Sequence, residues 1–440
     1  MKYSQFNSVV LYEEQYYLYN SFNQKFLVID SLLKDLLEAS VNEGVDGLEE
    51  IHPTFYAYLK SEGFLVDEEV DEVEKVKVIS KRVDENYDTF LLTINPTMNC
   101  NFKCWYCYET HIKASSFSQN MIDRVGYFIE KTVRRERMRL FNLSFFGGEP
   151  LLYFKRDVIP VINKLQKECV ENLVDYSVSF TTNGYLIDDS FIEYFKSTGI
   201  SPALQITLDG YKEKHDLVRY VNSEKGSYEV IIQNIKKLLL NSFFVRLRVN
   251  YTGENIEDTY KIAEEFDDIE ASIKKKFLLM DFHRVWQDSK NDDILDIVEE
   301  NTNKIKKTGI TVKHMAPNNV QDSCYADKRN SAVINYNGDL YKCTARDFTT
   351  AKRAGYLDET GEAIWENNYL DRRMDAKFKN KPCLSCRLLP ICNGGCSQHA
   401  MEALEEQKEY CIYYGDDVLK NNVVISKIKE IVDTLELHEV

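Results

Sequence analysis

Three features are missing from this 440-residue sequence, and each absence excludes a class of protein. It has no apolar stretch of about 18 residues, so we expect no transmembrane helix and no membrane partner. Its first residues, MKYSQFNSVVLYEEQYY, lack a long apolar core and a small-residue cleavage site. A secretory signal is therefore not expected, and we predict a cytoplasmic protein. The sequence also contains no internal repeat and no low-complexity tract.

Positive charge is scarce as well. The 55 basic residues are outnumbered by 71 acidic residues, which gives a net charge of −16. Nucleic acids and anionic membrane surfaces bind basic patches, so neither is expected as the main partner. Hydrophobic residues make up 44% of the sequence and charged residues 29%, which is typical of an ordinary globular protein with a large core.

Cysteine, in contrast, is plentiful and unevenly distributed. Of the 11 cysteines, only Cys169 stands alone, in a segment with helical periodicity. A cytosolic protein keeps its thiols reduced, so clustered cysteines indicate metal binding rather than disulfides. The first group lies in NCNFKCWYCY and comprises Cys100, Cys104 and Cys107. The second group comprises Cys324, Cys343, Cys383, Cys386, Cys392, Cys396 and Cys411.

The spacing of the first group, C-x3-C-x2-C, indicates a metal site with an open position. Three thiolates cannot complete a tetrahedral zinc site or coordinate every iron of a four-iron cluster. A missing protein ligand leaves room for a substrate, although a structural site with a distant fourth ligand is the alternative. The second group fits either iron–sulfur clusters or zinc, and its seven thiols do not divide into zinc sites without help from His399.

From Thr89 the sequence alternates between short apolar strands and amphipathic helices. Six strand–helix units in order predict a parallel sheet that curls toward a partial barrel. Catalytic groups gather at the carboxyl ends of the strands in such folds, so the first cysteine group, GGEP, TTNG and LDG should converge. The strands are predicted at residues 89–94, 142–148, 176–184, 202–210, 244–252 and 277–285.

Two smaller regions flank this core. Residues 1–66 combine paired strands with two helices, which suggests a winged-helix-like module, and a highly charged stretch follows as a predicted solvated connector. From about residue 311 the strand–helix regularity ends and the late cysteines dominate, as in a small metal-supported module. We therefore predict a recognition domain with its connector at 1–84, a barrel at 85–310 and a cysteine-rich domain at 311–440.

Together these motifs resemble the radical S-adenosylmethionine (SAM) superfamily. CNFKCWYC is similar to the C-x3-C-x-aromatic-C signature, and FFGGEP is similar to the glycine-rich motif after the second strand. The late cysteines, with Gly338 between Cys324 and Cys343, resemble the SPASM pattern of auxiliary clusters. The resemblance implies an α/β fold: a partial (β/α)6 radical SAM barrel, a small winged-helix-like N-terminal domain and a C-terminal iron–sulfur SPASM domain.

The same resemblance implies three [4Fe–4S] clusters and SAM as cofactors. One electron from the catalytic cluster would cleave SAM to a 5′-deoxyadenosyl radical, which abstracts a hydrogen atom from the substrate. The implied ligands are Cys100, Cys104 and Cys107 for the catalytic cluster, Cys383, Cys386, Cys392 and Cys411 for an outer auxiliary cluster, and Cys324, Cys343 and Cys396 for an inner one.

The resemblance also implies roles for residues near these clusters. The inner cluster lacks the eighth cysteine of many relatives, so its fourth ligand would be an open iron, Asp322 or a substrate thiolate. The expected SAM-binding residues are Gly147, Gly148 and Glu149 for the ammonium group, Ser179 and Asn183 for the ribose and carboxylate, and Tyr106 for the adenine.

Two classes of relative with this tail modify peptides or proteins. Anaerobic sulfatase maturases, which oxidise Cys or Ser to formylglycine, carry an Asp directly after the cysteine equivalent to Cys343. Thr344 occupies that place here, and the nearest Asp, Asp347, is the candidate for its role. This departure weakens the sulfatase-maturase hypothesis.

LDGYKEKHDLVR is similar to a stretch of peptide-modifying relatives, in which Asp209, His215 and Arg219 would line the substrate mouth. The hypothesis is a maturase of a ribosomally made precursor peptide that installs a thioether or carbon–carbon crosslink. The N-terminal domain would bind the leader of that peptide by strand addition, and flavodoxin or ferredoxin would supply electrons. A sulfatase-maturase-like enzyme and a non-catalytic iron–sulfur protein are the alternatives.

Overall fold

The computed structural model describes residues 1–222, 225–288, 294–313 and 321–436. The chain forms two compact units, each assembled from separate parts of the sequence. The first unit combines Met1–Asn86, Ala316–Arg329 and Asn368–Val440, and the second combines Tyr87–Met315 and Asn330–Asn367.

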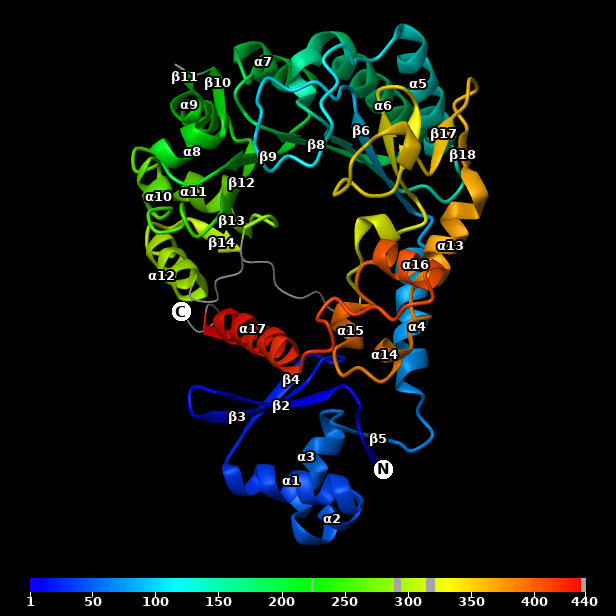
Figure 1. The fold of residues 1–440 in the computed structure, drawn as a ribbon, viewed down its shortest axis with the longest axis vertical. Coiled ribbons are helices and arrows are strands. Elements are labelled where there is room, and N and C mark those ends of the chain that lie inside the picture. Colours follow the sequence, from blue (N-terminus) through cyan, green and yellow to red (C-terminus); the bar gives the residue numbers. More distant parts are fainter. Residues whose placement is uncertain (223–224, 289–293, 314–320, 437–440) are drawn as a thin grey trace. The chain divides into compact units, whose positions relative to one another are not determined.

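Within the described residues, the second unit is built on an 11-stranded sheet whose central strands are parallel (Figure 1). All six strands predicted from the sequence are present, and they pair in chain order. The predicted α/β fold with a parallel barrel sheet is therefore confirmed. The six strands are β6 (Thr89–Asn95), β7 (Leu140–Phe145), β8 (Asp175–Thr182), β9 (Ala203–Leu208), β12 (Phe244–Tyr251) and β13 (Leu278–Arg284).

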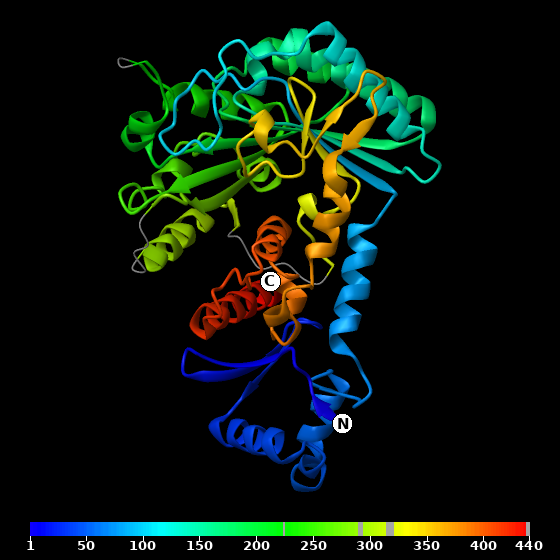
Figure 2. The ribbon, with the colours of Figure 1, turned by 45° about the vertical axis from the view of Figure 1, so that its right-hand side comes forward.

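Amphipathic helices cover the outer face of this sheet (Figures 1 and 2). Ser118 and Asp188 cap two of them, since their side chains accept hydrogen bonds from the backbone N–H groups of Met121 and Phe191. Between β12 and β13, helix α10 (Lys261–Glu264) is only a single turn. The long helices are α5 (Gln119–Val133), α6 (Ile159–Asn172), α7 (Asp189–Thr198), α9 (Tyr228–Leu240) and α12 (Ile294–Lys306).

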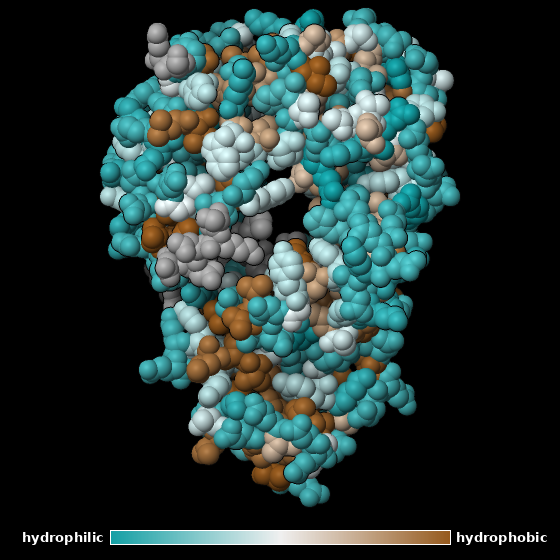
Figure 3. Space-filling model, in the orientation of Figure 1, coloured by the Kyte–Doolittle hydropathy of each residue, from teal (hydrophilic) through white to brown (hydrophobic). Residues whose placement is uncertain are grey.

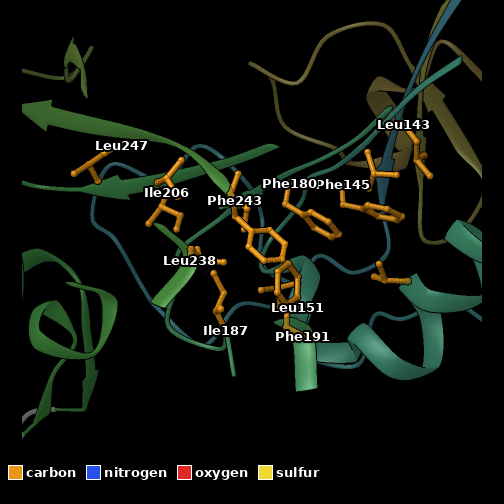
Figure 4. Close-up of a cluster of buried hydrophobic side chains, with 14 of the residues drawn as sticks. Leu143, Phe145, Leu151, Phe180, Ile187, Phe191, Ile206, Leu238, Phe243 and Leu247 are labelled. Atoms are coloured by element: carbon orange, nitrogen blue, oxygen red, sulfur yellow. The ribbon is translucent and has the colours of Figure 1, made fainter. Parts of the chain in front are cut away.

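The barrel core lies between these helices and the sheet. Figure 4 shows Phe145, Phe180 and Ile206 of the strands meeting Phe191 and Leu238 of the helices, and all five side chains are buried. Because side chains alternate along a strand, the opposite face of the sheet receives the remaining residues. That face, which carries no helix, is the one that polar strand residues occupy.

Segment 330–367 extends the sheet of the second unit, although the sequence-based division placed it in the cysteine-rich domain. Ala332 and Ile334 bury their side chains in the barrel core, and strand β15 (Ser331–Asn335) pairs in parallel with β6. Strand β14 (Thr311–Lys313) is added beside β13. The antiparallel strands β16 (Asp339–Tyr341), β17 (Gly355–Leu357) and β18 (Ala363–Trp365) continue beyond β15.

The N-terminal part of the first unit has the predicted winged-helix-like composition. Strands β2 (Asn7–Tyr12), β3 (Gln15–Asn20) and β4 (Lys25–Ile29) form an antiparallel sheet, and β1 (Lys2–Tyr3) pairs with β5 (Leu65–Val66). Glu13 and Glu14 join β2 to β3 with positive φ angles of 48° and 63°, as a type I′ hairpin turn requires. The helices of this module are α1 (Ser31–Glu43), α2 (Gly47–Ile51) and α3 (Pro53–Ser61).

Each face of this small sheet carries residues that pack in a hydrophobic cluster within the first unit. On one face Leu18 and Ile29 pack with residues of α1, α2 and α3. On the other face Val10 and Tyr19 share a cluster with Val424 of the C-terminal helix α17 (Asp417–Glu436). The two ends of the chain therefore build one core. The other helices of this unit are α13 (Tyr369–Ala376), α14 (Lys381–Leu384), α15 (Leu389–Cys392) and α16 (Ser397–Glu405).

The charged connector, predicted to be solvated, forms a helix with one buried side. Val76, Ser80 and Asp84 lie four residues apart on α4 (Glu72–Asp84) and are all buried. The Lys377 ammonium lies 2.6 Å from an Asp84 carboxylate oxygen and 3.4 Å from one of Asp327. The sequence hides this pattern, because the buried positions are outnumbered by the charged exposed positions.

The surface agrees with the composition. On the face drawn in Figure 3, hydrophilic residues dominate the upper part, and hydrophobic residues gather in the lower part of the view. Among the described residues, every helix is too short or too polar to cross a lipid bilayer.

Candidate functional site

The first cysteine group lies on the loop that follows β6 at the carboxyl end of the sheet. Cys100 and Cys104 pack against the barrel core, whereas Cys107 is exposed, and all three are free thiols. The N–H of Phe102 donates to Cys100 Sγ at 3.4 Å, and the N–H of Cys107 donates to the Cys104 carbonyl oxygen at 3.1 Å. These bonds hold the loop in tight turns between the cysteines.

The pKa values of these thiols are raised by burial and by one another. Burial, with the nearby Glu149 carboxylate, raises the pKa of Cys100 to about 12, and burial raises the pKa of Cys107 to about 11. The Cys104 thiol adds to both shifts, so the three sulfur atoms lie within electrostatic reach of one another. In the described residues no three metal-binding side chains converge on a single ion. The three soft thiols on one loop are the donor set that an iron–sulfur cluster requires.

The GGEP segment is fastened to the backbone just before the cysteine loop. The N–H of Gly148 donates to the Thr97 carbonyl at 3.1 Å, and the N–H of Glu149 donates to the Asn99 carbonyl at 2.9 Å. A Cβ atom at Gly148 would lie 2.3 Å from the Asn99 oxygen, and one at Gly147 would lie 2.6 Å from the Thr97 oxygen. Only glycine permits this approach, so the pair of glycines helps to position the cysteine loop.

The Glu149 side chain is wholly buried, and the protein occupies both of its oxygens. Oε1 accepts hydrogen bonds from the N–H of Leu151 at 2.9 Å and the hydroxyl of Thr182 at 2.8 Å, and Oε2 accepts one from the N–H of Asn183 at 2.8 Å. Burial raises its pKa. The carboxylate thus joins the loops after β7 and β8.

The remaining predicted cofactor residues lie around the same edge of the sheet. Asn183 donates from Nδ2 to Asn101 Oδ1 at 2.8 Å, which connects the TTNG turn to the cysteine loop. Ser179 lies on β8, in register with Ser144 of β7 and Ala203 of β9. These placements bring Asn183 to the cysteine loop and leave Ser179 further along its strand.

Tyr106 stands at the centre of a buried polar network. Its hydroxyl donates to Asp209 Oδ1 at 2.6 Å and accepts hydrogen bonds from Arg219 Nη2 at 2.7 Å and Asn250 Nδ2 at 2.9 Å. The Arg219 guanidinium also forms an ion pair with Asp209. Residues from the cysteine loop, β9, β12 and the end of α8 (Lys212–Val218) are therefore held together, and the predicted Asp209 and Arg219 lie next to the first cysteine group.

His215 lies behind Asp209 and is fully buried. Its Nδ1 accepts a hydrogen bond from the Asp209 N–H at 3.2 Å, and its Nε2 lies 2.9 Å from Ser227 Oγ, which donates to the Arg219 carbonyl. Burial and then the Arg219 charge lower the pKa of His215 well below its ordinary value. The imidazole is neutral, and it positions Asp209 and Arg219 rather than lining an open mouth.

Asp347 holds the end of the cysteine loop. Its Oδ1 accepts a hydrogen bond from the Thr110 N–H at 2.9 Å, and its Oδ2 accepts one from the Thr110 hydroxyl at 3.1 Å. The Tyr108 hydroxyl donates to the Thr344 carbonyl at 2.6 Å, which adds a second tie between the same two segments. The residues after Cys343 therefore contact the residues after Cys107.

Sequence reasoning missed Glu109, although it lies two residues after Cys107. Its Oε2 is enclosed and has no hydrogen-bond partner among the described residues. Burial, followed by the nearby Asp347 charge, raises its pKa to about 8. The only feature of the sequence that could have pointed to Glu109 is its position two residues after Cys107. Nothing in the tetrapeptide CYET indicates that this side chain is buried.

The late cysteines of the first unit form a second group. Burial raises the pKa of Cys392 to about 12, with Cys383, Cys386 and Cys411 adding to the shift, so these four thiols lie near one another. Cys386 and Cys392 pack beside the cluster that joins the N-terminal sheet to α17. These four thiols are the predicted ligands of the outer cluster, which stays a prediction. The other three late cysteines are divided: Cys324 and Cys396 belong to the first unit and Cys343 to the second.

Residues 94–266 match the profile of the Radical SAM superfamily. The chain therefore contains a radical SAM domain. It is thus an enzyme that uses SAM and a [4Fe–4S] cluster, and the matched segment includes the cysteine loop, GGEP and the Tyr106 network.

Relatives of this radical SAM enzyme have more than one substrate class. The chain is 24% identical over 345 residues to the cysteine-type anaerobic sulfatase-maturating enzyme of Clostridium novyi, a match that covers 68% of this chain and 86% of that protein. It is 23% identical over 276 residues to the probable GTP 3′,8-cyclase of Methanococcus vannielii, covering 59% and 85%. Identity at this level does not select a substrate.

Solved structures show the same fold. The native sulfatase maturase anSMEcpe with bound AdoMet and the Cp18Cys peptide aligns with a TM-score of 0.54 and 17% identity, covering 72% of this chain and 97% of that one. Streptococcus suis SuiB bound to its precursor peptide SuiA aligns with a TM-score of 0.51 and 17% identity, covering 92% and 97%. The alignment with SuiB extends over almost the whole of this chain.

Proposed function

We propose that this radical SAM enzyme is a maturase that installs an intramolecular thioether or carbon–carbon crosslink in a ribosomally made precursor peptide. The observation that carries the proposal is the presence, in one chain, of a radical SAM barrel and a winged-helix-like N-terminal module. SuiB, whose alignment covers 92% of this chain, is a protein solved with a precursor peptide. Flavodoxin or ferredoxin would supply the electrons, and the reaction would take place in the cytoplasm, where thiols stay reduced.

Three [4Fe–4S] clusters are part of this proposal. When bound, the catalytic cluster and SAM supply one-electron chemistry that removes a hydrogen atom from the substrate. Cys100, Cys104 and Cys107 would hold the catalytic cluster. Cys383, Cys386, Cys392 and Cys411 would hold the outer auxiliary cluster, and Cys324, Cys343 and Cys396 would hold the inner one.

The side chains around the cysteine loop keep the reaction site rigid and partly dry. The ion pair of Asp209 with Arg219 is neutral overall and fixes the Tyr106 ring beside the loop. The Glu149 carboxylate accepts hydrogen bonds from Thr182 and Asn183 and so fixes the TTNG turn. A site of this kind positions reacting atoms through supporting contacts that do not need to rearrange.

The edge strand β4 of the N-terminal module is the proposed binding place for the leader of the precursor peptide. Among the described residues, no other strand pairs with its outer edge, so its backbone is available to a peptide strand. Val28 on β4 and Leu32 at the start of α1 are 44% and 77% exposed, which offers apolar contact beside that edge. The opposite edge strand, β2, contacts α17 instead.

Product analysis tests the proposed reaction. Reconstituted enzyme with a reductant should convert SAM to 5′-deoxyadenosine. It should also remove two hydrogen atoms from the peptide encoded by a short reading frame beside the gene, without forming an aldehyde. Absence of 5′-deoxyadenosine would overturn the enzyme assignment. An aldehyde trapped with a hydrazine would instead show formylglycine, the sulfatase-maturase reaction that the Clostridium novyi relative makes the second candidate.

Leader binding is tested separately with two exposed residues of the same sheet. Val28→Asp should weaken the affinity for the full precursor at least about tenfold, because it places a charge beside the proposed peptide strand. Leu11→Asp is the matched control, since Leu11 is 57% exposed on the other edge strand. Equal effects of the two variants would contradict binding at β4.

A further inference from the structure

Strand β13 carries an aspartate and a histidine two residues apart, and it lies beside β12 in the barrel sheet (Figure 1). Met280 and Phe282 of this strand bury their side chains in the barrel core. Because side chains alternate along a strand, Asp281 and His283 point to the opposite face. These two side chains therefore lie on the face of the sheet that carries no helix.

The carboxyl end of β13 lies next to the cysteine loop. His283 pairs in register with Asn250 of β12, and Asn250 Nδ2 donates to the Tyr106 hydroxyl at 2.9 Å. The side-chain amide of Gln287 donates to the Tyr106 carbonyl oxygen at 3.0 Å. His283 therefore lies at the same edge of the sheet as Tyr106 and the cysteine loop that carries it.

Asp281 fixes the orientation of the His283 imidazole. Asp281 Oδ2 lies 3.0 Å from His283 Nε2 and accepts a hydrogen bond from Arg246 Nε at 2.6 Å. Burial raises the pKa of Asp281, but the hydrogen bond from His283 and the Arg246 charge outweigh burial and lower it. The ionised carboxylate can only accept, so the hydrogen between the two side chains belongs to Nε2. In the neutral imidazole the other ring nitrogen, Nδ1, then carries the lone pair of a base.

Nδ1 of His283 is open to a substrate. Among the described residues it has no hydrogen-bond partner, and it is not one of the enclosed unpartnered atoms. Three carboxylates beside the cysteine loop differ from it, because hydrogen bonds from the protein already engage Asp209, Glu149 and Asp347. His283 therefore presents an unengaged base at an edge of the sheet where these carboxylates serve structural contacts.

We propose that His283 is the proton acceptor for bond formation in the substrate peptide. The inference rests on the proposed function, in which a crosslink replaces two hydrogens of the peptide. The first leaves its carbon as a hydrogen atom and completes 5′-deoxyadenosine. When the resulting carbon radical bonds to a sulfur or to a second carbon, the S–H or C–H bond at that atom breaks. Its proton passes to His283 Nδ1, and the remaining electron reduces an iron–sulfur cluster of the enzyme.

The amount of crosslinked peptide formed per molecule of 5′-deoxyadenosine tests the proposal on reconstituted enzyme. His283→Asn should lower this ratio about 100-fold, since a positioned base contributes that much to a proton transfer. His52→Asn is the matched control, because His52 caps α3 by accepting from the Phe55 N–H at 3.2 Å and Asn is also a capping residue. Imidazole added to His283→Ala should restore part of the ratio. Iron content and peptide affinity are measured in parallel, and His283→Asn should match the wild type in both.

Two results would show that the proposal is wrong. One is a wild-type ratio in His283→Asn. The other is a ratio in His283→Ala that imidazole leaves unchanged, and because this comparison is made within one variant, a folding defect cannot imitate it. A wild type that forms an aldehyde instead of a crosslink would overturn the proposed function. That reaction also releases a proton of the substrate, so the same variants, with aldehyde as the measured product, would still test His283.

Discussion

The two cysteine regions of the molecule differ in how their thiols are held. The first group occupies one loop, and backbone hydrogen bonds from GGEP position that loop. Of the late group, Cys386 and Cys392 pack beside the side-chain cluster that joins the N-terminal sheet to α17. A site held by backbone contacts is encoded locally, whereas a site held by side-chain packing depends on residues that are distant in the sequence.

Cysteine replacement gives the largest expected difference between the two regions. The wild type should contain about twelve irons in three clusters. The triple variant Cys100→Ala, Cys104→Ala, Cys107→Ala should lose about a third of that iron and all cleavage of SAM, because the SAM-binding iron is gone. The double variant Cys386→Ala, Cys392→Ala should lose a similar share of iron but keep cleavage of SAM. Iron analysis and 5′-deoxyadenosine release measure both effects, and iron that saturates near four would contradict the auxiliary clusters.

The buried ion pair of Lys377 allows the stability of the first unit to be tested separately from that of the barrel. Lys377→Met should destabilise that unit by about 3–5 kcal/mol, because Asp84 would be left buried without its cation, whereas Asp327 keeps Arg373 at 3.9 Å. The effect should appear as a lower temperature for the unfolding of the first unit. The unfolding temperature of the barrel should not change. A shift of both unfolding temperatures together would show that the two units unfold as one.

The glycine of GGEP tests the backbone attachment of the first group. Gly148→Ala should lower SAM cleavage at least about tenfold, because its Cβ would meet the Asn99 oxygen at 2.3 Å and displace the cysteine loop. Gly47→Ala is the control, since a Cβ there meets nothing within 4 Å. Wild-type cleavage by Gly148→Ala would mean that the loop does not depend on this contact.

The smallest expected effect concerns the pH dependence of barrel stability. His215 has a lowered pKa in the folded protein, so the unfolded chain binds more protons below about pH 6.5 and stability falls as the pH falls. The loss is at most about 1.4 kcal/mol per pH unit. His215→Asn should flatten this slope between pH 6.5 and 5 in thermal unfolding, and an unchanged slope would show that another group titrates there.

Local patterns in the sequence predicted the barrel and its loop well. The six strands were found because alternation and flanking glycines are properties of short segments, and the cysteine loop and GGEP follow their strands as expected. The fold of segment 330–367 was not found, because β15 reaches its place only by pairing with β6. Glu109 was missed for a related reason: its burial and the nearby Asp347 charge depend on the fold rather than on its neighbours in the sequence.

The pairing of β15 with β6 bears on how the chain is made. Strand β6 lies inside the sheet, yet one of its two neighbours is Ser331–Asn335, which a ribosome adds long after Thr89–Asn95. At usual elongation rates the interval is roughly ten to fifty seconds. During that time the edge of β6 is exposed on the nascent chain and is open to intermolecular pairing. Synthesis of this enzyme therefore contains a vulnerable period in which chaperones that cover strand edges would raise its yield.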